Sequence, residues 1–321
     1  MNRLVLGIFL ALLGAAATAQ EYPTRPINII VPAAAGGPTD TLTRVLAQAM
    51  GEALRQQMII ENVGGAGGTI GINRAAKAKP DGYTLLLYHI GMATSPALYR
   101  KLQYDTLNDF DYIGQVADVP MMLIAKKATP ANTFPEFLSY AKANKDKLTY
   151  ANAGLGSASY LCGILFMSAI DTSFTMVPYK GTGPAMNDLV GGQVDFMCDQ
   201  TTNTVPQIKS GNVKAYGVTT ASRLASMPDM ATLNEQGLKG FDLVVWNGLF
   251  GPKGMPRPAV EKLVAALQTA VQSAAFRARL ADLGAEPVPL SKANPGSLGN
   301  LLKAEVEKWG PIIKKTGVFA D

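Results

Sequence analysis

The chain has 321 residues and a formal net charge of +5 at pH 7, and 48% of its residues are hydrophobic. Its Lys and Arg residues are scattered and form no basic stripe with interleaved aromatic side chains, so we expect no nucleic-acid partner. One histidine and two cysteines cannot furnish an ordinary structural zinc site without the help of carboxylates, and we expect neither a metal nor a cofactor.

Residues 1–19 have the three parts of an export signal. Arg3 supplies the positive start, Leu4–Ala16 the apolar segment, and Ala17-Thr18-Ala19 the small residues of a cleavage site. The apolar segment is shorter than the roughly 20 residues that a membrane-spanning helix needs. We therefore predict a cleaved signal peptide over residues 1–19. The alternative is an uncleaved membrane anchor.

The first predicted strand leads through a loop of small residues into a helix. Ile27–Val31 is a run of mostly branched apolar residues that Pro32 ends, and Thr39 or Asp40 is predicted to cap the amphipathic helix that follows. Between them, residues 33–37 have no side chain larger than a methyl group. Such a loop lets a ligand contact backbone N–H groups, and a helix N-terminus favours negative charge. The segment therefore predicts a binding site for an anion.

The rest of the chain alternates between strands and helices, which is typical of parallel sheets with helices on their faces. A mature chain of about 300 residues exceeds what one small core usually supports, so two lobes are expected. We predict an α/β fold with two lobes, two crossovers and a ligand cleft between the lobes. The predicted strands are Ile27–Val31, Met58–Glu61, Tyr83–Tyr88, Tyr112–Val116, Met121–Ala125, Leu148–Tyr150, Thr175–Tyr179, Val194–Cys198, Lys214–Val218 and Leu243–Phe250, and the predicted helices include Pro135–Asn144, Ser157–Ala169, Pro184–Val190, Pro258–Val271, Ala274–Leu283 and Ser297–Lys315.

Two breaks predict the lobe boundaries, one near residue 126 and one at Trp246–Pro252. They give lobe 1 as residues 20–125 plus 248–321, and lobe 2 as residues 126–247. The helices predicted after the second break have few strands of their own to cover, so we expect them to return to lobe 1.

Two more loops at strand ends are expected to line the cleft. The glycine-rich segment 64–71 opens a predicted helix and could add backbone donors. A dinucleotide-binding fingerprint is a competing interpretation, but the acidic residue that it requires about 20 positions later is missing. The other competing interpretation of segment 64–71 is a flexible turn. In segment 151–159, Ser157 and Ser159 are either helix caps or ligand contacts. Two more strand-end segments, 177–183 and 195–199, could also reach the cleft, and Asp199 is the carboxylate of interest there.

The sequence offers few candidates for catalysis. His89 is the sole histidine, and the sequence has no nucleophile elbow, zinc-protease motif or phosphate-binding loop. We expect the protein not to be an enzyme, and the alternative is a secreted enzyme with His89 as the base. Cys162 and Cys198 fit a disulfide or two buried free thiols equally well.

A series of motifs, in order along essentially the whole mature chain, resembles the Bug (TctC-like) extracytoplasmic solute receptors of tripartite tricarboxylate transporters. The motifs are Pro23-x-x-Pro26-Ile-x-Ile-Ile-Val31-Pro-x-Ala-x-Gly36-Gly37-Pro-x-Asp40, Glu61-Asn62-x-x-Gly65-Ala-Gly67-Gly68-x-Ile-Gly71, Ala78-x-Pro80-Asp81-Gly82-Tyr83, Val177-Pro178-Tyr179-Lys180-Gly181, Leu189-x-Gly191-Gly192-Gln193-Val194-Asp195, Val218-Thr219-x-x-x-Arg223-x-x-x-x-Pro228-Asp229 and Gly248-x-Phe250-x-Pro252-x-Gly254. The resemblance implies a periplasmic binding protein, expected to be a monomer, whose lobes close around a small carboxylate. It also implies a membrane permease component as the partner.

The resemblance further implies that backbone groups and bridging waters hold one carboxylate of the ligand. The matching positions are Ala34, Ala35, Gly36, Gly37 and Asp40, then Gly67, Gly68 and Thr69, and in lobe 2 Ala153, Gly154, Ser157 and Asp199. Ser159 joins this set from its place in the loop, as described above.

The sequence departs from the family pattern after Leu87, where glycine, serine and threonine are usual and Tyr88-His89 stands instead. His89 could donate to a second carboxylate, and Tyr88 could lie against a flat ligand. Our hypothesis is an aromatic carboxylate or dicarboxylate. The alternatives are that Tyr88 faces the core and His89 a neighbouring loop, that the ligand is an aliphatic dicarboxylate, and that the receptor serves a sensor kinase.

Overall fold

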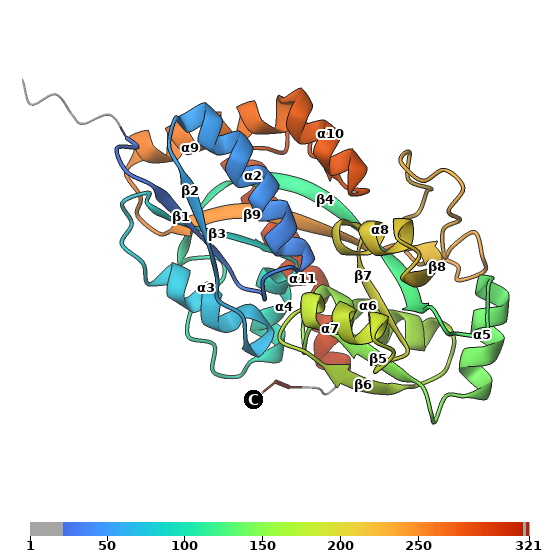
Figure 1. Ribbon diagram of the computed structural model, residues 1–321. Helices are drawn as coiled ribbons and strands as arrows, with labels where there is room; N and C mark the ends of the chain where they lie inside the picture. Colours follow the sequence, from blue (N-terminus) through green and yellow to red (C-terminus); the bar gives the residue numbers. More distant parts are fainter. Residues whose placement is uncertain (1–21, 317–318, 321) are drawn as a thin grey trace, which may run out of the picture.

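The computed structural model describes residues 22–316 and 319–320 (Figure 1), so the predicted signal peptide, residues 1–19, lies outside the described residues. In the described ranges, no helix combines the length and the apolar character needed to cross a bilayer.

The strands of the described chain form one mixed sheet with the order β2-β1-β3-β9-β4-β7-β5-β6, and β8 and β10 pair with β4 outside this path. Their bounds are β1 Ile27–Val31, β2 Met58–Asn62, β3 Thr84–His89, β4 Phe110–Lys126, β5 Thr149–Asn152, β6 Thr175–Pro178, β7 Phe196–Gln200, β8 Val213–Val218, β9 Val244–Pro252 and β10 Glu286–Pro287. β1 is parallel to β2 and β3, and β5 is parallel to β6 and β7. The prediction of parallel sheets is therefore confirmed at both ends of the sheet. It is wrong at the centre, where β9 is antiparallel to β3 and β4 because β4 and β9 cross the molecule in opposite directions.

β4 is one continuous strand of 17 residues, so the prediction of two strands at Tyr112–Val116 and Met121–Ala125 is wrong. Asp118 and Pro120 disfavour a strand in the sequence. In the structure they lie just before the point where β4 changes partners. Up to Pro120 the strand pairs with β9, and from Met121 onward it pairs with β7 and β8. β4 thus leads from one half of the molecule into the other (Figure 1). The predicted boundary at residues 125 and 126 falls at the end of β4, and that at 247 and 248 falls inside β9.

Helices cover both faces of the sheet (Figure 1). Their bounds are α2 Pro38–Leu54, η1 Ala66–Gly68, α3 Thr69–Ala76, α4 Gly91–Leu98, α5 Phe134–Ala143, α6 Ala158–Ala169, α7 Thr182–Val190, α8 Thr201–Lys209, α9 Arg257–Gln272, α10 Ala274–Asp282 and α11 Pro295–Thr316. α9 and α10 pack against α2, and α11 packs against α4 and β4. The C-terminal helices therefore cover elements from the first third of the chain. α2 packs through Leu42, Leu46 and Met50, which the helical period places on one face.

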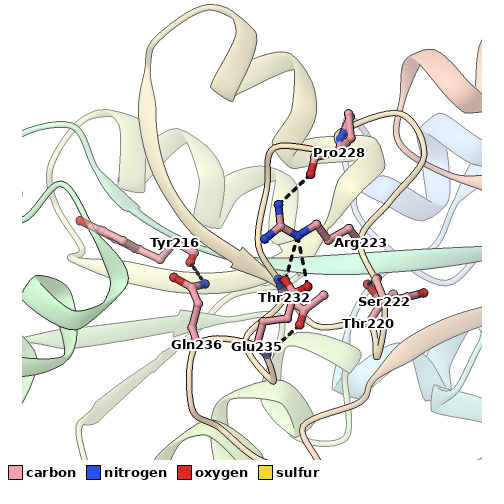
Figure 2. A network of polar contacts seen from close by, with 8 residues as sticks. All are labelled: Tyr216, Thr220, Ser222, Arg223, Pro228, Thr232, Glu235 and Gln236. Carbon is pink, nitrogen blue, oxygen red and sulfur yellow. Dashed lines mark hydrogen bonds and ion pairs between the residues drawn. The ribbon is translucent and has the colours of Figure 1, made fainter.

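The second half of the molecule has two stabilising features of its own. Cys162 on α6 and Cys198 on β7 form a disulfide between two buried positions, which decides between the two interpretations of these cysteines. The long connection between β8 and β9 is tied together by Arg223, which donates to both carboxylate oxygens of Glu235 and to the carbonyl of Pro228 (Figure 2).

Candidate ligand-binding site

A cavity of about 310 Å³ lies where loops at the carboxyl ends of strands from both halves of the sheet meet. The loops after β1 and β2 and the last residues of β3 line it from one side, and the loops after β5 and β6 and the last residues of β7 line it from the other. Its lining residues are Pro32, Ala33, Ala34, Gly37, Pro38, Thr39, Gly65, Ala66, Gly67, Gly68, Tyr88, His89, Tyr99, Ala153, Gly154, Leu155, Ser157, Ala158, Ser159, Pro178, Tyr179, Lys180, Gly181, Thr182, Asp199, Gln200 and Ala320. The cavity therefore lies in the predicted cleft.

Three α-helices of the described chain line this cavity with residues of their first turn. The first residues of α2, α6 and α7 line it, at Gly37–Thr39, Ser157–Ser159 and Gly181–Thr182. The first turn of a helix has unpaired backbone N–H groups and a partial positive charge. Since α2 comes from one half of the molecule and α6 and α7 come from the other, an anion in the cavity is stabilised from both sides.

The N-cap of α2 is Gly37, so the prediction of Thr39 or Asp40 as the cap is wrong. Both residues lie inside the first turn, because the helix begins at Pro38, whose fixed φ suits the first helical position. Asp40 instead accepts a hydrogen bond from the backbone N–H of Gly36 at 2.9 Å and forms an ion pair with Arg44 at 3.0 Å. Burial alone would raise the pKa of Asp40, but these hydrogen bonds outweigh burial and lower it. Asp40 therefore fixes the shape of the loop.

Four of the predicted site residues do not line the cavity in the described part of the chain, namely Ala35, Gly36, Asp40 and Thr69. The hydroxyl of Thr69 donates to the carbonyl of Ala66 at 2.9 Å, inside its own loop. The other predicted residues, from Ala34 to Asp199, are brought together around one space.

Tyr88 is buried and packs into the core beside the second glycine loop. Its hydroxyl donates to the carbonyl of Gly67 at 2.9 Å, and its ring touches the positions that a Cβ would occupy on Gly68 and Gly91. Its ring also stacks on His89, with 4.1 Å between centroids and 27° between planes. Only glycine at position 68, where φ is +96°, leaves room for this ring.

His89 combines the two predicted environments. It lines the cavity, and its Nδ1 accepts the backbone N–H of Gly91 at 3.2 Å, in the turn between β3 and α4. Burial lowers the pKa of His89 to about 3, so the ring is neutral at physiological pH.

The loop after β5 is held by its own serines. Ser157 caps α6, since its hydroxyl oxygen accepts the N–H of Tyr160 at 3.2 Å, and Ser159 accepts the N–H of Ala153 at 2.9 Å. Both serines also line the cavity. Their capping role and their place beside a ligand are therefore compatible.

Asp199 places a carboxyl group at the cavity. It accepts hydrogen bonds from the backbone N–H of Gln200 at 2.8 Å and from the amide of Asn203 at 2.5 Å. Burial raises the pKa of Asp199 to about 6, despite these hydrogen bonds. A protonated Asp199 is compatible with a bound anion beside it, whereas an ionised Asp199 repels a bound anion.

The sequence did not identify Tyr99, Gln200 and Ala320 as site residues, although they line the cavity. Residues 178–182 line it too, within the strand-end segment 177–183 that the sequence placed at the cleft. The glycines beside Thr182 before a predicted helix repeat the pattern of the first loop, and this signal points to the segment after β6. Tyr99 and Ala320 reach the cavity through packing between distant parts of the chain.

The two halves of the molecule touch around the cavity. Thr94 on α4 donates to the carbonyl of Gly156 at 3.0 Å across the interface. A methyl group on Gly181 would lie 3.0 Å from the Cβ of Ala34. The structure is therefore a closed form in which loops of the two halves are in contact.

Comparison with known proteins gives consistent matches along the chain. The model of a family described as "Tripartite tricarboxylate transporter family receptor" matches residues 42–318. A protein from the TAR-I ttuE-ttuC' intergenic region of Agrobacterium vitis is 48% identical, over 94% of this chain and 87% of its own. BugT of Bordetella pertussis is 34% identical, over 99% of this chain and 98% of its own.

Solved structures match in the same way. The periplasmic binding protein BugD has a TM-score of 0.90 at 49% identity, over 93% of this chain and 99% of its own. MatC from Rhodopseudomonas palustris with bound malate has a TM-score of 0.86 at 41% identity, over 91% and 100%. An R. palustris protein with adipate has a TM-score of 0.88 at 30% identity, over 93% and 99%. Periplasmic binding proteins with two lobes thus share this fold.

Proposed function

Since this chain belongs to the family of tripartite tricarboxylate transporter receptors, we propose that it captures a small dicarboxylate between its lobes and delivers it to a membrane permease. Receptors of this family are periplasmic, bind small carboxylates and work with transporter permeases. We propose that residues 1–19 direct this chain to the same compartment and that it acts there as a monomer.

The convergence of helix N-termini from both halves on one cavity is the observation that supports this proposal. α2, α6 and α7 present backbone N–H groups and partial positive charge to the same space. A carboxylate that contacts loops of both lobes interacts with the closed form more strongly than with an open form. Ligand binding therefore stabilises closure, because a ligand favours the state for which it has the higher affinity.

The size and lining of the cavity favour a small aliphatic diacid. A volume of about 310 Å³ is at the lower end of the range for ligand pockets. Two related structures hold malate and adipate. The aromatic carboxylate predicted from Tyr88 is less well supported, because Gly68, Gly91 and His89 already cover the ring of Tyr88. Aromatic acids therefore belong in the test panel as the competing class.

The environment of His89 supports binding over catalysis. A general base works best with a pKa near the working pH, whereas burial lowers the pKa of His89 to about 3. Its Nδ1 already accepts a hydrogen bond from Gly91. A secreted enzyme that uses His89 as its base is therefore the weaker alternative.

Thermal unfolding with a panel of acids tests the proposal. The panel pairs each diacid with a monoacid of the same skeleton: malate with 3-hydroxybutyrate, succinate with butyrate, adipate with hexanoate, and terephthalate with benzoate. A ligand at 100 times its Kd adds about 2.7 kcal/mol to the free energy of unfolding, which raises Tm by several degrees. We expect an aliphatic diacid to do so and to be recovered unchanged.

Four results would contradict parts of this proposal. Stabilisation by terephthalate alone would restore the aromatic class. Conversion of the acid to a product would favour an enzyme. No stabilisation by any acid would argue against a carboxylate receptor. Acid uptake that persists in a strain without the permease, combined with lost transcriptional induction in a strain without the receptor, would favour a sensor kinase as the partner.

A further inference from the structure

His89 has a single tautomer. Its Nδ1 accepts the backbone N–H of Gly91 at 3.2 Å, so Nδ1 has no proton. In a neutral imidazole one nitrogen donates and the other accepts. The proton of the neutral ring is therefore on Nε2, which makes Nε2–H a donor.

The ring plane of His89 is fixed as well. It stacks on Tyr88 with 4.1 Å between the ring centroids. Tyr88 is itself held by a hydrogen bond from its hydroxyl to Gly67 and by close packing against Gly68 and Gly91. Since one edge of the imidazole faces Gly91 and one face covers Tyr88, the Nε2 edge and the second face of the ring are left for the cavity.

Nε2 has no protein acceptor among residues 22–316 and 319–320, and no acidic residue of these ranges forms an ion pair with His89. The residue is only 6% exposed and lines the cavity. A donor that lines the cavity and has no protein acceptor is available to a ligand, so a ligand that supplies an acceptor here gains a hydrogen bond.

The position of His89 in the sheet separates it from the anion-binding loops. It ends β3, which lies on one side of β1, whereas the second glycine loop follows β2 on the other side. A ligand whose first carboxylate contacts the loops after β1 and β2 therefore extends toward His89 with its other end.

We propose that His89 is a specificity-determining residue whose Nε2–H donates to the second carboxylate of the ligand and thereby selects diacids over monoacids. This inference rests on the proposed function. The neutral Nε2–H of His89 donates a hydrogen bond without adding charge to the cavity, so the preference for diacids over monoacids does not require a charged imidazolium.

Two amide substitutions separate a donor role from a structural role. In His89→Asn, the side-chain oxygen can still accept the N–H of Gly91, but no donor reaches the Nε2 position. In His89→Gln, an amide N–H takes the place of Nε2–H, and the bond to Gly91 is lost. If His89 acts only through its hydrogen bond to Gly91, the asparagine variant should behave like the wild type. If it acts as a donor to the ligand, the glutamine variant should behave like the wild type.

The measurement is the ratio of affinities for adipate and hexanoate, and for malate and 3-hydroxybutyrate, by isothermal titration calorimetry. We expect the ratio to fall by about tenfold to a hundredfold in His89→Asn and to stay near the wild-type value in His89→Gln. Hexanoate or 3-hydroxybutyrate should bind both variants about as they bind the wild type. An unchanged ratio in His89→Asn, or an equal loss in both variants, would overturn the proposal.

A second measurement needs no ligand. Because His89 is the sole histidine of the chain, selective ¹⁵N labelling of the untagged mature protein gives the signals of this ring alone. We expect a neutral ring protonated at Nε2 from about pH 5 to 8, and a shift of the Nε2–H signal when adipate or malate is added. An Nδ1–H tautomer or an imidazolium at pH 6 would refute the inference even if acids bind. Failure of every acid to bind the wild type would instead refute the proposed function.

Discussion

Replacing Gly183 with alanine should weaken ligand binding without destabilising the lobe that contains it. Gly183 lies in the first turn of α7, so alanine suits its backbone. An added methyl group would lie 3.0 Å from the carbonyl oxygen of Ala35, 3.2 Å from the N–H nitrogen of Gly37 and 3.3 Å from the carbonyl carbon of Gly36. All three atoms belong to the loop after β1, in the opposite half of the molecule.

The size of the effect follows from the difference between the open and closed forms. Alanine is favoured over glycine in a helix by about 0.5–1 kcal/mol, and this gain is the same in both forms. The clash occurs only in the closed form and involves backbone atoms, which no rotation of a side chain can move away. Overpacking of this kind costs about 1–3 kcal/mol, which corresponds to a loss of affinity of about 5- to 150-fold.

Calorimetric titration with the best acid of the panel measures this loss, and thermal unfolding without ligand measures the helix effect. Gly310→Ala is the matched control, because Gly310 also lies within a helix and no atom lies within 4 Å of its added Cβ. We expect Gly310→Ala to keep wild-type affinity. If Gly183→Ala binds the acid as tightly as the wild type does, the contact between α7 and the loop after β1 is not part of the bound state, and the argument fails.

Three further predictions concern the same molecule. Because burial raises the pKa of Asp199 to about 6, its carboxyl group loses a proton as the pH rises through that value and then repels an anionic ligand. The affinity for a diacid should therefore fall by up to about tenfold per pH unit from pH 6 to 8. Calorimetric titrations at several pH values should show this fall in the wild type and no such fall in Asp199→Asn. Thr94→Val removes the hydrogen bond to Gly156 between the lobes and should lower affinity by about fivefold, while the Tm without ligand changes little; an unchanged affinity would show that this bond is absent from the bound state. Replacing Cys162 and Cys198 together with serine releases a crosslink that spans 36 residues and should lower the free energy of unfolding by about 4 kcal/mol in urea titrations; equal stability of the variant and the oxidised protein would contradict this.

The segment around the first loop was predictable because its signals are local. A branched apolar run ended by a proline, five small residues and an amphipathic stripe fix β1, the loop and α2 within one short stretch of chain. The cap was mispredicted because Gly37 has no side chain to signal it, and Asp40 turned out to hold Gly36.

Other features depend on contacts between distant segments. The continuity of β4 past Pro120 depends on β9, whose Val244 pairs with that proline. Tyr99 and Ala320 lie at the cavity only because α4 and the C-terminal end of the chain are placed there by the finished fold. The role of Tyr88 was left open by its sequence, since Gly68, which packs against its ring, becomes its neighbour only in the folded protein.

The position of β9 also determines when the sheet in the first half of the molecule can be completed during synthesis of the chain. Leu86 on β3 pairs with Phe250 on β9, so the N-terminal strands must wait for a partner that is synthesised long after them. Contacts that join distant residues slow folding, and an unpaired apolar strand edge promotes association with other chains. The sequence Leu85-Leu86-Leu87 is buried in the finished sheet, but on an incomplete chain it is an open edge. Until β9 is available, this edge has no partner on that side and is open to pairing with other chains.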